Sequence, residues 1–517
     1  MSAARTDTAQ GFTGPRPPVA FNMADYAIGR AARTWPDKEA LVVLADASGR
    51  AETWTFVRIE DSVLRIAAAL ADRGLQRGDR IMIRLENTPE YAFLFFGAIA
   101  GGFVPIPASS ALTASEAQVL LEDSGAAMIA LAPTLPVERI PAGVTIADDR
   151  EVASWVGHPR KSAYAPTLAE DPAYLVYTSG TTARPKGVLH AHRAAWGRRP
   201  MYEGWYGIGE DDRVLHAGAF NWTYTLGTGL TDPWANGATA LVYAGEKDAG
   251  LWPRLIAASR ATIFAAVPSL YRQILKYAPD GLAAAMPTLR HGLIAGEAPP
   301  PGLFEAWREA AGSELYEAFG MSEMSTYLSS APAVPRRAGF IGKAQPGRAV
   351  AIIPQEGEPR PLPAGEEGLI AVHRSDPGLM LGYWQRPDEE RQVFRGDWFI
   401  GGDLGVTDAD GYIAHRGRAN DLMKAMGYRV APQEVEAVLA RVPGVAEVAC
   451  AEVRVRDDVS VIGAFIVPAG EHRPQIATLE AAAEAALAPY KRPRKYVFVD
   501  TLPRTPNGKL KRGALAG

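Results

Sequence analysis

Hydrophobic and polar positions along the first half of the chain alternate between a helical and a strand period. Residues 61–73 carry their apolar side chains on one helical face, and an apolar run at residues 80–85 is typical of a short buried strand. Residues 88–101 predict a second helix, which leads into a strand at residues 103–106. The alternation recurs further along the chain, with a strand predicted at residues 261–267 and a helix at residues 268–277. Such alternation predicts a largely parallel α/β sheet with crossover helices.

The last hundred residues have a different pattern. A helix begins after Pro432, and two strands, a second helix and a final strand follow it. We expect these elements at residues 433–439, 445–453, 459–467, 476–487 and 495–499. Together they predict a small α+β domain with a core of its own.

A chain of 517 residues is too long for one hydrophobic core, so at least two domains are expected. We divide it into a disordered leader, a large α/β domain of mixed or parallel sheets with flanking helices, and the small α+β domain, at residues 1–20, 21–418 and 419–517. The leader has no apolar core of signal-peptide length. The apolar residues 91–108 are interrupted by glycine and proline, which favours a buried helix and strand over a membrane span.

Composition excludes several classes of protein. The formal net charge of −4 gives no electrostatic reason to expect nucleic acid or an anionic membrane as a partner. The single cysteine, Cys450, excludes an intramolecular disulfide framework, and the eight histidines have no metal-binding spacing. These features favour a cytoplasmic protein.

The most informative segment follows an apolar strand at residues 173–177. Residues 178–187 read Thr-Ser-Gly-Thr-Thr-Ala-Arg-Pro-Lys-Gly. Glycines let backbone N–H groups approach an anion, hydroxyls add donors, and Lys186 supplies positive charge. This combination predicts a loop that binds a polyphosphate, with a polar surface loop as the alternative. It is not a Walker A loop, because no Gly-Lys-Ser/Thr closes it.

Further motifs follow the loop along the chain. They lie at residues 295–298 (Ala-Gly-Glu-Ala), 319–323 (Phe-Gly-Met-Ser-Glu), 402–403 (Gly-Asp), 417–418 (Gly-Arg), 424–429 (Lys-Ala-Met-Gly-Tyr-Arg) and 503–509 (Pro-Arg-Thr-Pro-Asn-Gly-Lys). In this order they resemble the adenylate-forming superfamily, which includes acyl-CoA synthetases, luciferases and peptide-synthetase adenylation domains. The resemblance covers nearly the whole chain after the leader. It is closest to AMP-forming acyl-CoA synthetases of the benzoate–CoA ligase type.

The resemblance implies a site for ATP and Mg²⁺. The phosphates would contact Thr178, Ser179, Gly180, Thr181, Thr182 and Lys186. The adenine pocket would consist of Gly296, Glu297, Ala298, Phe319, Gly320 and Met321, with the base stacked on Phe319. The hydroxyl of Ser322 would contact the α-phosphate, and Glu323 and Thr178 would hold Mg²⁺. The ribose would be bound by Asp403 and Arg418.

The resemblance also assigns the catalytic residues. Lys509 resembles the family's catalytic lysine, which bridges the acid and the α-phosphate during adenylation. Thr178, Ser322 and Glu323 complete this set. The resemblance also implies Lys509 as a target for a protein lysine acetyltransferase, because many enzymes that the chain resembles are silenced by acetylation. The modification would remove the positive charge of Lys509.

Other implied positions concern the second half of the reaction and departures from the family. The C-terminal domain would be mobile about a hinge at Asn420, and Gly427 would let the pantetheine arm of coenzyme A pass. The basic run at residues 491–495 either meets the phosphates of coenzyme A or forms a solvated surface. Ala183 replaces a glycine that is common in the phosphate loop.

The implied reaction is adenylation of a carboxylic acid by ATP with release of pyrophosphate, followed by acyl transfer to coenzyme A and release of AMP. An aryl carboxylate is the first choice of acid, because Gly320 stands where acetyl-CoA synthetases have a tryptophan that narrows their pocket. The expected pocket contains Phe220, Trp222, Thr223, Tyr224, Ala295 and Gly320. The alternatives are a medium-chain or branched aliphatic acid, or a stand-alone adenylation enzyme that loads a carrier protein.

Overall fold

The structure, a computed structural model, describes residues 11–46, 48, 51–178, 185–246, 248–277, 281–300, 302–419, 423–425, 428–430, 432–456, 459–470, 473–504 and 510–515. The chain packs as two compact units. The first unit contains Met1–Ala298, Leu303–Ala349 and Val372–Asp397, and the second contains Pro299–Gly302, Val350–Ala371 and Trp398–Gly517. Because the chain passes between the units several times, this division has no single boundary residue. The domain boundary expected at residue 418 stays a prediction.

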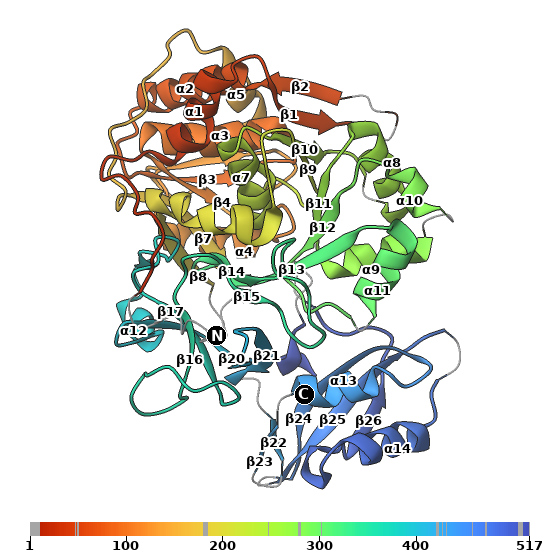
Figure 1. Ribbon diagram of the computed structural model, residues 1–517. Coiled ribbons are helices and arrows are strands. Elements are labelled where there is room, and N and C mark those ends of the chain that lie inside the picture. The colour runs from red at the N-terminus through yellow and green to blue at the C-terminus, as the bar shows by residue number, and fades with distance from the viewer. Residues whose placement is uncertain are drawn as a thin grey trace, which may run out of the picture. The chain divides into compact units, whose positions relative to one another are not determined.

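A nine-stranded sheet forms the centre of the first unit (Figure 1). Its strand order is β15-β14-β13-β12-β11-β9-β10-β1-β2. Neighbouring strands from β13 to β1 are parallel, whereas β14, β15 and β2 are antiparallel to their neighbours. The strands are β1 (Glu39–Leu44), β2 (Ala51–Thr55), β9 (Arg213–His216), β10 (Thr239–Tyr243), β11 (Ile263–Ala266), β12 (His291–Ile294), β13 (Glu314–Met321), β14 (Ser325–Ser329) and β15 (Lys343–Ala344). The predicted α/β fold with a largely parallel sheet is confirmed.

A second sheet of this unit is parallel throughout, with the order β4-β3-β5-β6. Its strands are β3 (Arg80–Arg84), β4 (Val104–Pro107), β5 (Met128–Leu131) and β6 (Thr145–Ala147). Helix α3 (Pro89–Gly101) connects β3 to β4, as predicted; it begins with proline in its first turn and ends at Gly102, which has a left-handed φ of +79°. Its side chains are almost all buried, which explains its continuous apolar sequence.

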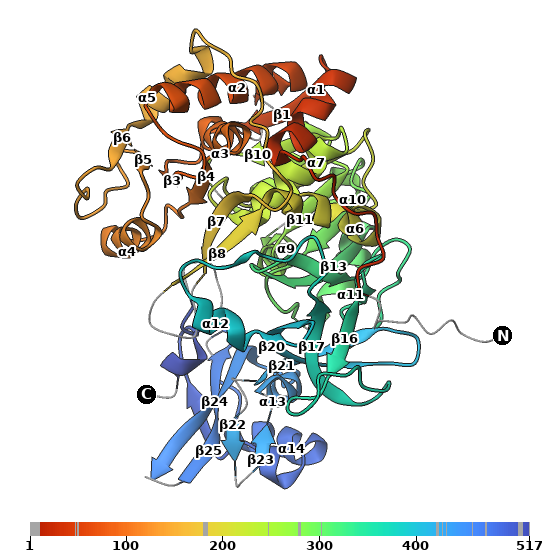
Figure 2. The same cartoon turned by 90° about the vertical axis from the view of Figure 1, so that its left-hand side faces the viewer.

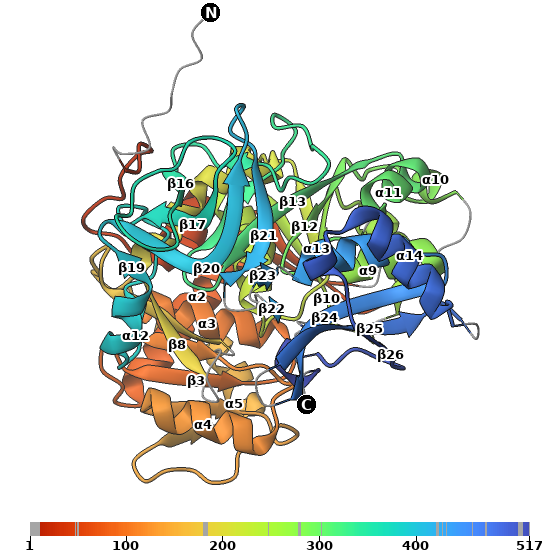
Figure 3. The same cartoon turned by 90° about the horizontal axis from the view of Figure 1, so that it is seen from below.

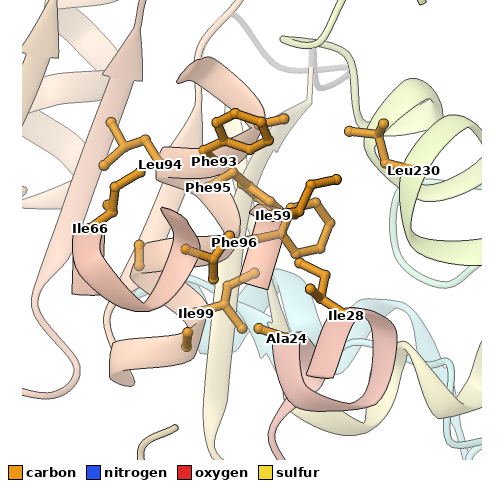
Figure 4. Packing of buried hydrophobic residues seen from close by; sticks show 14 of the residues in the cluster. Ala24, Ile28, Ile59, Ile66, Phe93, Leu94, Phe95, Phe96, Ile99 and Leu230 are labelled. Carbon is orange, nitrogen blue, oxygen red and sulfur yellow. The ribbon is translucent and has the colours of Figure 1, made fainter. Parts of the chain in front are cut away.

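Helix α2 (Phe56–Asp72) begins at Phe56, earlier than the predicted start at residue 61. Thr55 has an extended backbone, and the side chain of Phe56 is fully buried, so the helix starts where the chain enters the core. Ile59 and Ile66 of α2 join Phe93 and Phe96 of α3 in one hydrophobic cluster, seen from close by in Figure 4.

The other elements of the first unit are shorter. Helix α9 follows β11 directly, as the pattern of residues 261–277 predicts. These elements are α1 (Arg30–Thr34), α4 (Ala114–Ser124), α5 (Asp149–Ser154), α6 (Arg199–Met201), α7 (Asp232–Ala235), α8 (Trp252–Ser259), α9 (Pro268–Tyr277), α10 (Leu282–Ala285), α11 (Leu303–Ala311), α12 (Pro387–Gln392) and β19 (Phe394–Arg395). In the part of the chain that the structure describes, no helix has the length and hydropathy needed to cross a membrane.

A small antiparallel sheet contains the two strands that flank the predicted phosphate loop in the sequence (Figure 2). Its order is β18-β8-β7, and its strands are β7 (Pro172–Thr178), β8 (Lys186–Ala191) and β18 (Gly382–Tyr383). Thr178 at the end of β7 pairs with Lys186 at the start of β8. The two ends of the loop are therefore neighbours.

The expectation of a disordered leader is wrong for residues 11–20. Phe12 is buried, and its backbone N–H donates to the hydroxyl of Ser375 at 2.8 Å. The carbonyl of Pro15 accepts from the Trp196 indole at 2.8 Å, and Ala20 forms a bridge with Leu168. These contacts depend on partners far along the chain, which the leader sequence alone does not reveal.

The second unit contains one larger sheet and the small domain predicted from residue 432 onward. In the larger sheet β16 (Val350–Ile353), β17 (Glu367–His373) and β20 (Trp398–Thr407) lie in this order, and β21 (Ile413–Arg418) is antiparallel to β20. The strands β22 (Met423–Ala425) and β23 (Tyr428–Val430) form a separate antiparallel pair.

The small domain is a three-stranded sheet with two helices (Figure 3). Its elements are α13 (Pro432–Leu439), β24 (Val445–Arg456), β25 (Val459–Pro468), α14 (Ile476–Ala486) and β26 (Lys495–Phe498), in agreement with the predicted α+β set. Both helices pack on one face of the sheet, where Val435 and Leu479 contact a cluster that includes Ile462. Leu502 and Leu515 pack in a cluster on the other face.

Candidate active site

The carboxyl ends of parallel strands lie along one edge of the nine-stranded sheet. Ile294 at the end of β12 pairs with Ala266 at the end of β11 and with Glu317 in β13. The predicted adenine-pocket residues 295–298 directly follow β12, and Phe319 lies near the end of β13. Ligands of open α/β sheets bind outside this edge. The fold therefore brings two of the predicted motifs to the edge at which a nucleotide is expected.

Gly296 makes the turn at the end of β12. Its φ of +91° is a left-handed backbone conformation that residues with a side chain rarely adopt. Among the described residues, a Cβ built there would have atoms of Trp222 and Val267 within 4 Å, each at 3.9 Å. The described residues therefore leave space beside Gly296, with the Trp222 ring on one side.

The turn that contains Ser322 and Glu323 is held by three hydrogen bonds from remote segments. His190 Nε2 donates to the Ser322 carbonyl at 2.7 Å. The Met380 N–H donates to the Glu323 carbonyl at 2.7 Å, and the Tyr383 hydroxyl donates to Glu323 Oε1 at 2.8 Å. Both predicted site residues are therefore fixed in position, and the Glu323 carboxylate is also oriented.

His190 is a buried side chain stacked on Tyr174, with ring centroids 4.7 Å apart. Burial lowers the pKa of His190 to about 4, so the imidazole is neutral near pH 7 and carries its proton on Nε2. His190, which was not among the predicted site residues, therefore packs on Tyr174 and also positions Ser322. Its place just after the phosphate loop was the available signal.

Tyr383 connects the phosphate-loop lysine to Glu323. The Lys186 ammonium lies 5.4 Å from the centroid of the Tyr383 ring, whose hydroxyl is bound to Glu323. Lys186 also forms an ion pair with Glu389 of α12. Sequence reasoning missed Tyr383; the only local signal was its place between Gly382 and an aromatic neighbour.

The residues assigned to Mg²⁺ have suitable chemistry for it. Glu323 and Thr178 are both half-buried and offer a carboxylate and a hydroxyl, which are hard oxygen ligands. Within the described residues, no group of three or more His, Cys, Asp or Glu side chains is arranged to hold a metal ion. One carboxylate and one hydroxyl suit Mg²⁺, which usually keeps phosphate oxygens and water as its other ligands.

Gly320 does not open a pocket in the way that the sequence suggested. A Cβ at this position would lie 2.1 Å from the Ser325 carbonyl oxygen and 2.4 Å from the Thr326 Cα. The strand pair β13–β14 has an irregular register at this point, between Phe319 and Gly320. Glycine is therefore required for the close approach of β14, and the room expected in place of a tryptophan side chain is filled by backbone.

Of the three aromatic residues expected in the acid pocket, one belongs to the core instead. Phe220 is fully buried in the main hydrophobic cluster, so it belongs to the core. Trp222 and Tyr224 remain half-buried and pack edge to face, with centroids 5.0 Å apart, and Thr223 between them in sequence is also half-buried. The Tyr224 hydroxyl oxygen is buried and has no hydrogen-bond partner among the described residues.

A buried ion pair lies near Tyr224. Arg198 binds Asp232 through two hydrogen bonds, of 2.8 and 2.6 Å, and Tyr206 donates to the same carboxylate at 2.6 Å. Arg198 Nη1 also donates to the Ser325 hydroxyl at 2.5 Å. Ser325 has a left-handed φ of +75°, a strained conformation for serine. The network therefore holds the first residue of β14, two positions after Glu323.

Glu317 is a further residue that sequence reasoning missed. Burial raises the pKa of its carboxyl to about 8, with nearby Arg336 opposing the shift. Its backbone exchanges hydrogen bonds with Ser330, and it lies two residues before Phe319, on the same face of β13. The signal available in the sequence was an acidic residue two positions before Phe319, the ring predicted to stack on adenine.

The predicted ribose-binding residues are neighbours in the second unit. Asp403 on β20 pairs with Arg418 on β21, and Arg418 Nη2 lies 3.7 Å from Asp403 Oδ2. His415 Nε2 lies 2.9 Å from Asp403 Oδ1, a contact that the sequence did not suggest. The guanidinium of Arg418 also donates to the Gly401 carbonyl at 2.5 Å. Asp403 is buried, so these contacts fix its carboxylate.

Two residues of the basic run at 491–495 form ion pairs within the small domain, which favours a surface role for them over binding of the coenzyme A phosphates. Lys491 forms an ion pair with Glu434, and Arg492 forms one with Glu484. Several other predicted positions lie outside the described residues: Ser179, Gly180, Thr181, Thr182, Ala183, Asn420, Gly427 and Lys509.

Comparison with known proteins places the chain in a family. The profile of the AMP-binding enzyme family matches residues 28–384, and that of the AMP-binding enzyme C-terminal domain matches residues 434–509. The chain therefore belongs to the AMP-binding enzyme family, as its motifs predicted.

Individual relatives narrow the class. The chain is 31% identical to a 3-hydroxybenzoate–CoA ligase of Aromatoleum sp. (strain CIB), over 95% of this chain and 96% of the relative. It is similar in structure to a benzoate CoA ligase from Burkholderia xenovorans LB400, with a TM-score of 0.85 and 28% identity. The match covers 96% of this chain and 100% of that ligase. The anthranilate CoA ligase AuaEII, solved with anthranoyl-AMP, gives a TM-score of 0.82 at 27% identity. This match covers 96% of this chain and 97% of that ligase. The prediction of an AMP-forming acyl-CoA ligase is confirmed at the level of enzyme class.

Proposed function

We propose that this protein is an AMP-forming ligase that joins an aryl carboxylic acid to coenzyme A. The observation that carries the proposal is the Ser322–Glu323 turn, which His190 and Tyr383 fix beside Lys186. The names of the similar ligases support an aromatic acid as the substrate class.

In the first step a carboxylate oxygen of the acid attacks the α-phosphorus of ATP, and the bond to pyrophosphate breaks to give acyl-AMP. Two anions meet and charge grows at phosphorus, so fixed positive groups and donors lower the barrier. We assign Lys509 to the acid and α-phosphate, the Ser322 hydroxyl to the α-phosphate, and Lys186 to the other phosphates. Lys186 would exchange its ion pair with Glu389 for phosphate oxygens.

Bound Mg²⁺ would neutralise phosphate charge, held by the Glu323 carboxylate and the Thr178 hydroxyl. The role of Tyr383 is then to orient Glu323 toward the phosphates.

The nucleoside would be held by residues of two kinds. The adenine ring would stack on Phe319, and Glu317, on the same face of β13, would bind a polar edge of the base. Asp403 would accept from the ribose hydroxyls, with His415 and Arg418 fixing its carboxylate.

In the second step the sulfur of coenzyme A attacks the acyl carbon, and AMP leaves with its phosphate oxygen to give the thioester. Acyl-AMP is a better electrophile than the free carboxylate, because its leaving group, AMP, is a stabilised anion. Gly427 is proposed to leave room for the pantetheine arm. A cytoplasmic location and control by a protein lysine acetyltransferase acting on Lys509 also remain proposals.

Tyr224 refines the substrate class. Its buried hydroxyl has no hydrogen-bond partner among the residues that the structure describes, and a buried donor left unsatisfied costs about 1–3 kcal/mol. A hydroxyl or amino group on the aromatic ring of the acid would satisfy it. We therefore propose a hydroxy- or aminobenzoate as the preferred acid over unsubstituted benzoate.

The test is pyrophosphate release with ATP, Mg²⁺ and benzoate, 3-hydroxybenzoate, 2-aminobenzoate or hexanoate, with and without coenzyme A. We expect the substituted benzoates to react best and a thioester to form only with coenzyme A. Lys509→Ala should lower release by about 100- to 1,000-fold, whereas Lys511→Ala serves as the matched control and should not.

Tyr224→Phe should reduce the preference for the substituted acids over benzoate by about tenfold. Best activity with hexanoate would support the aliphatic alternative and contradict the aryl assignment. Acid-dependent pyrophosphate release without any thioester would support a carrier protein as the acyl acceptor.

A further inference from the structure

The strand β24 is the edge strand of the sheet in the small domain. It pairs with β25, where Cys450 lies opposite Ala464, and β25 in turn pairs with β26. An edge strand leaves a row of backbone N–H and C=O groups without a neighbouring strand. In β24 the peptide groups of Cys450 are satisfied by side chains instead.

Glu436 and Arg512 bind these two groups. The Cys450 N–H donates to Glu436 Oε1 at 2.6 Å, and Arg512 Nη1 donates to the Cys450 carbonyl at 2.7 Å. The two side chains also bind each other: Arg512 Nη2 donates to Glu436 Oε2 at 2.9 Å, and Nη1 donates to Oε1. This arrangement, which we call the edge clamp, consists of Glu436, Arg512 and the peptide groups of Cys450.

The edge clamp is largely withdrawn from solvent. The side chains of Arg512 and Glu436 are 17% and 16% exposed. A forked pair of charge-assisted hydrogen bonds has a fixed geometry, unlike a single contact between flexible surface charges. The clamp therefore joins helix α13, strand β24 and the last segment of the chain.

That last segment begins just after Lys509. Arg504 and Leu510 form an antiparallel bridge, and the Lys511 N–H donates to the Pro503 carbonyl at 2.8 Å. Leu515 is buried against the sheet. The chain on both sides of residues 505–509 is therefore anchored, and Arg512 is the charged anchor on the C-terminal side.

We propose that Arg512, acting through the edge clamp, is a positioning residue for Lys509 in adenylation. Lys509 precedes Arg512 by three residues in the sequence, and three residues of extended chain span at most about 11 Å. This inference rests on the proposed function, in which Lys509 acts in the first half-reaction and not in the second.

The test separates the two half-reactions. The first is measured as acid-dependent pyrophosphate release, and the second as thioester formation from chemically synthesised acyl-AMP and coenzyme A. Arg512→Met should lower pyrophosphate release by about 100-fold, because small errors in the placement of a reacting group have effects of this size. Thioester formation from supplied acyl-AMP should stay within about twofold of wild type.

Three further variants make the test specific. Glu436→Gln keeps the shape of the clamp but removes its charge, and should lower the first half-reaction in the same direction. Arg473→Met is the matched control, because Arg473 is an exposed arginine of the same domain that lies over the Phe498 ring and is not part of the edge clamp. In a Lys509→Ala background, Arg512→Met should have no further effect, since the two residues act as a unit.

Several outcomes would overturn the inference. Near-normal pyrophosphate release by Arg512→Met would do so, and so would an equal loss of both half-reactions. If Arg512→Met does not fold, as judged by thermal unfolding, Arg512→Lys decides: it keeps the charge but not the fork, so it should selectively slow the first half-reaction. If the wild-type protein released no pyrophosphate with any acid, the proposed function would be overturned instead. A fully active Lys509→Ala variant would overturn the assignment of Lys509.

Discussion

The Ser322–Glu323 turn of the first unit and the edge clamp of the second hold site segments in different ways. The turn is held by a buried histidine, and the adjoining Ser325 by an ion pair whose Arg198 and Asp232 side chains are 10% and 0% exposed. The edge clamp is a pair of side chains added to the free edge of a small sheet. The first arrangement uses the same interactions that fold the unit, whereas the second attaches a segment to a sheet that is already formed.

This difference teaches which parts of the molecule combine function with stability. A group placed by buried polar contacts cannot be released without leaving other buried groups unsatisfied. Release of the edge clamp also leaves Glu436 and the Cys450 peptide groups without these contacts, but β24 stays paired with β25 along its other edge. Substitutions around the turn should therefore affect folding and activity together, and substitutions in the clamp should affect activity first.

The largest effect is expected from breaking the buried ion pair. Asp232→Asn leaves the Arg198 charge buried without its partner and should lower the free energy of unfolding by about 3–5 kcal/mol. Chemical denaturation measures this change. The matched control is Asp388→Asn, whose ion pair with Arg391 is exposed on both sides and should change stability by less than about 1 kcal/mol. Equal stability of the two variants would contradict the comparison.

A pH dependence of stability is expected next in size. Burial lowers the pKa of His190, His192 and His291 to about 4, whereas an unfolded histidine titrates near pH 6.5. The unfolded chain therefore binds more protons below pH 6.5, and stability should fall as the pH drops from 6.5 toward 4.

His190→Gln tests one of these three contributions. Glutamine retains an N–H donor for the Ser322 carbonyl but does not titrate, so it should reduce the slope by up to about 1.4 kcal/mol per pH unit. Denaturation series at pH 7, 6 and 5 measure the slope for both proteins. An unchanged slope would show that His190 is not held neutral in the folded unit.

The smallest effect is expected where the turn meets the proposed cation. Tyr383→Phe removes the hydrogen bond to Glu323 but keeps the ring beside Lys186, so it should raise the Mg²⁺ concentration for half-maximal pyrophosphate release by about tenfold. Tyr277→Phe, at an exposed tyrosine, is the control. An unaltered Mg²⁺ requirement in Tyr383→Phe would remove Tyr383 from the site.

Sequence periodicity located elements whose apolar pattern is local. Helix α9 matches its predicted range, and the elements of the small domain match to within a few residues. The start of α2 was predicted late because residues 56–60 include polar side chains, and only the burial of Phe56 shows that the helix has already begun. The order of the motifs was enough to identify the family, because each motif is a short stretch of residues whose type and spacing can be recognised without knowledge of the fold.

The chain by itself thus determined the fold class, the enzyme class and the identity of most candidate site residues. Only the tertiary structure decided what positions them: Tyr383 contacts Glu323 from 60 residues away, and Arg512 contacts Glu436 from 76 residues away. It also decided that Gly320 admits the backbone of β14 and that Phe220 is a core residue. The physical reason is that local pattern fixes which element a residue joins, whereas a partner distant in sequence is fixed only when sheet order and register bring the two elements together.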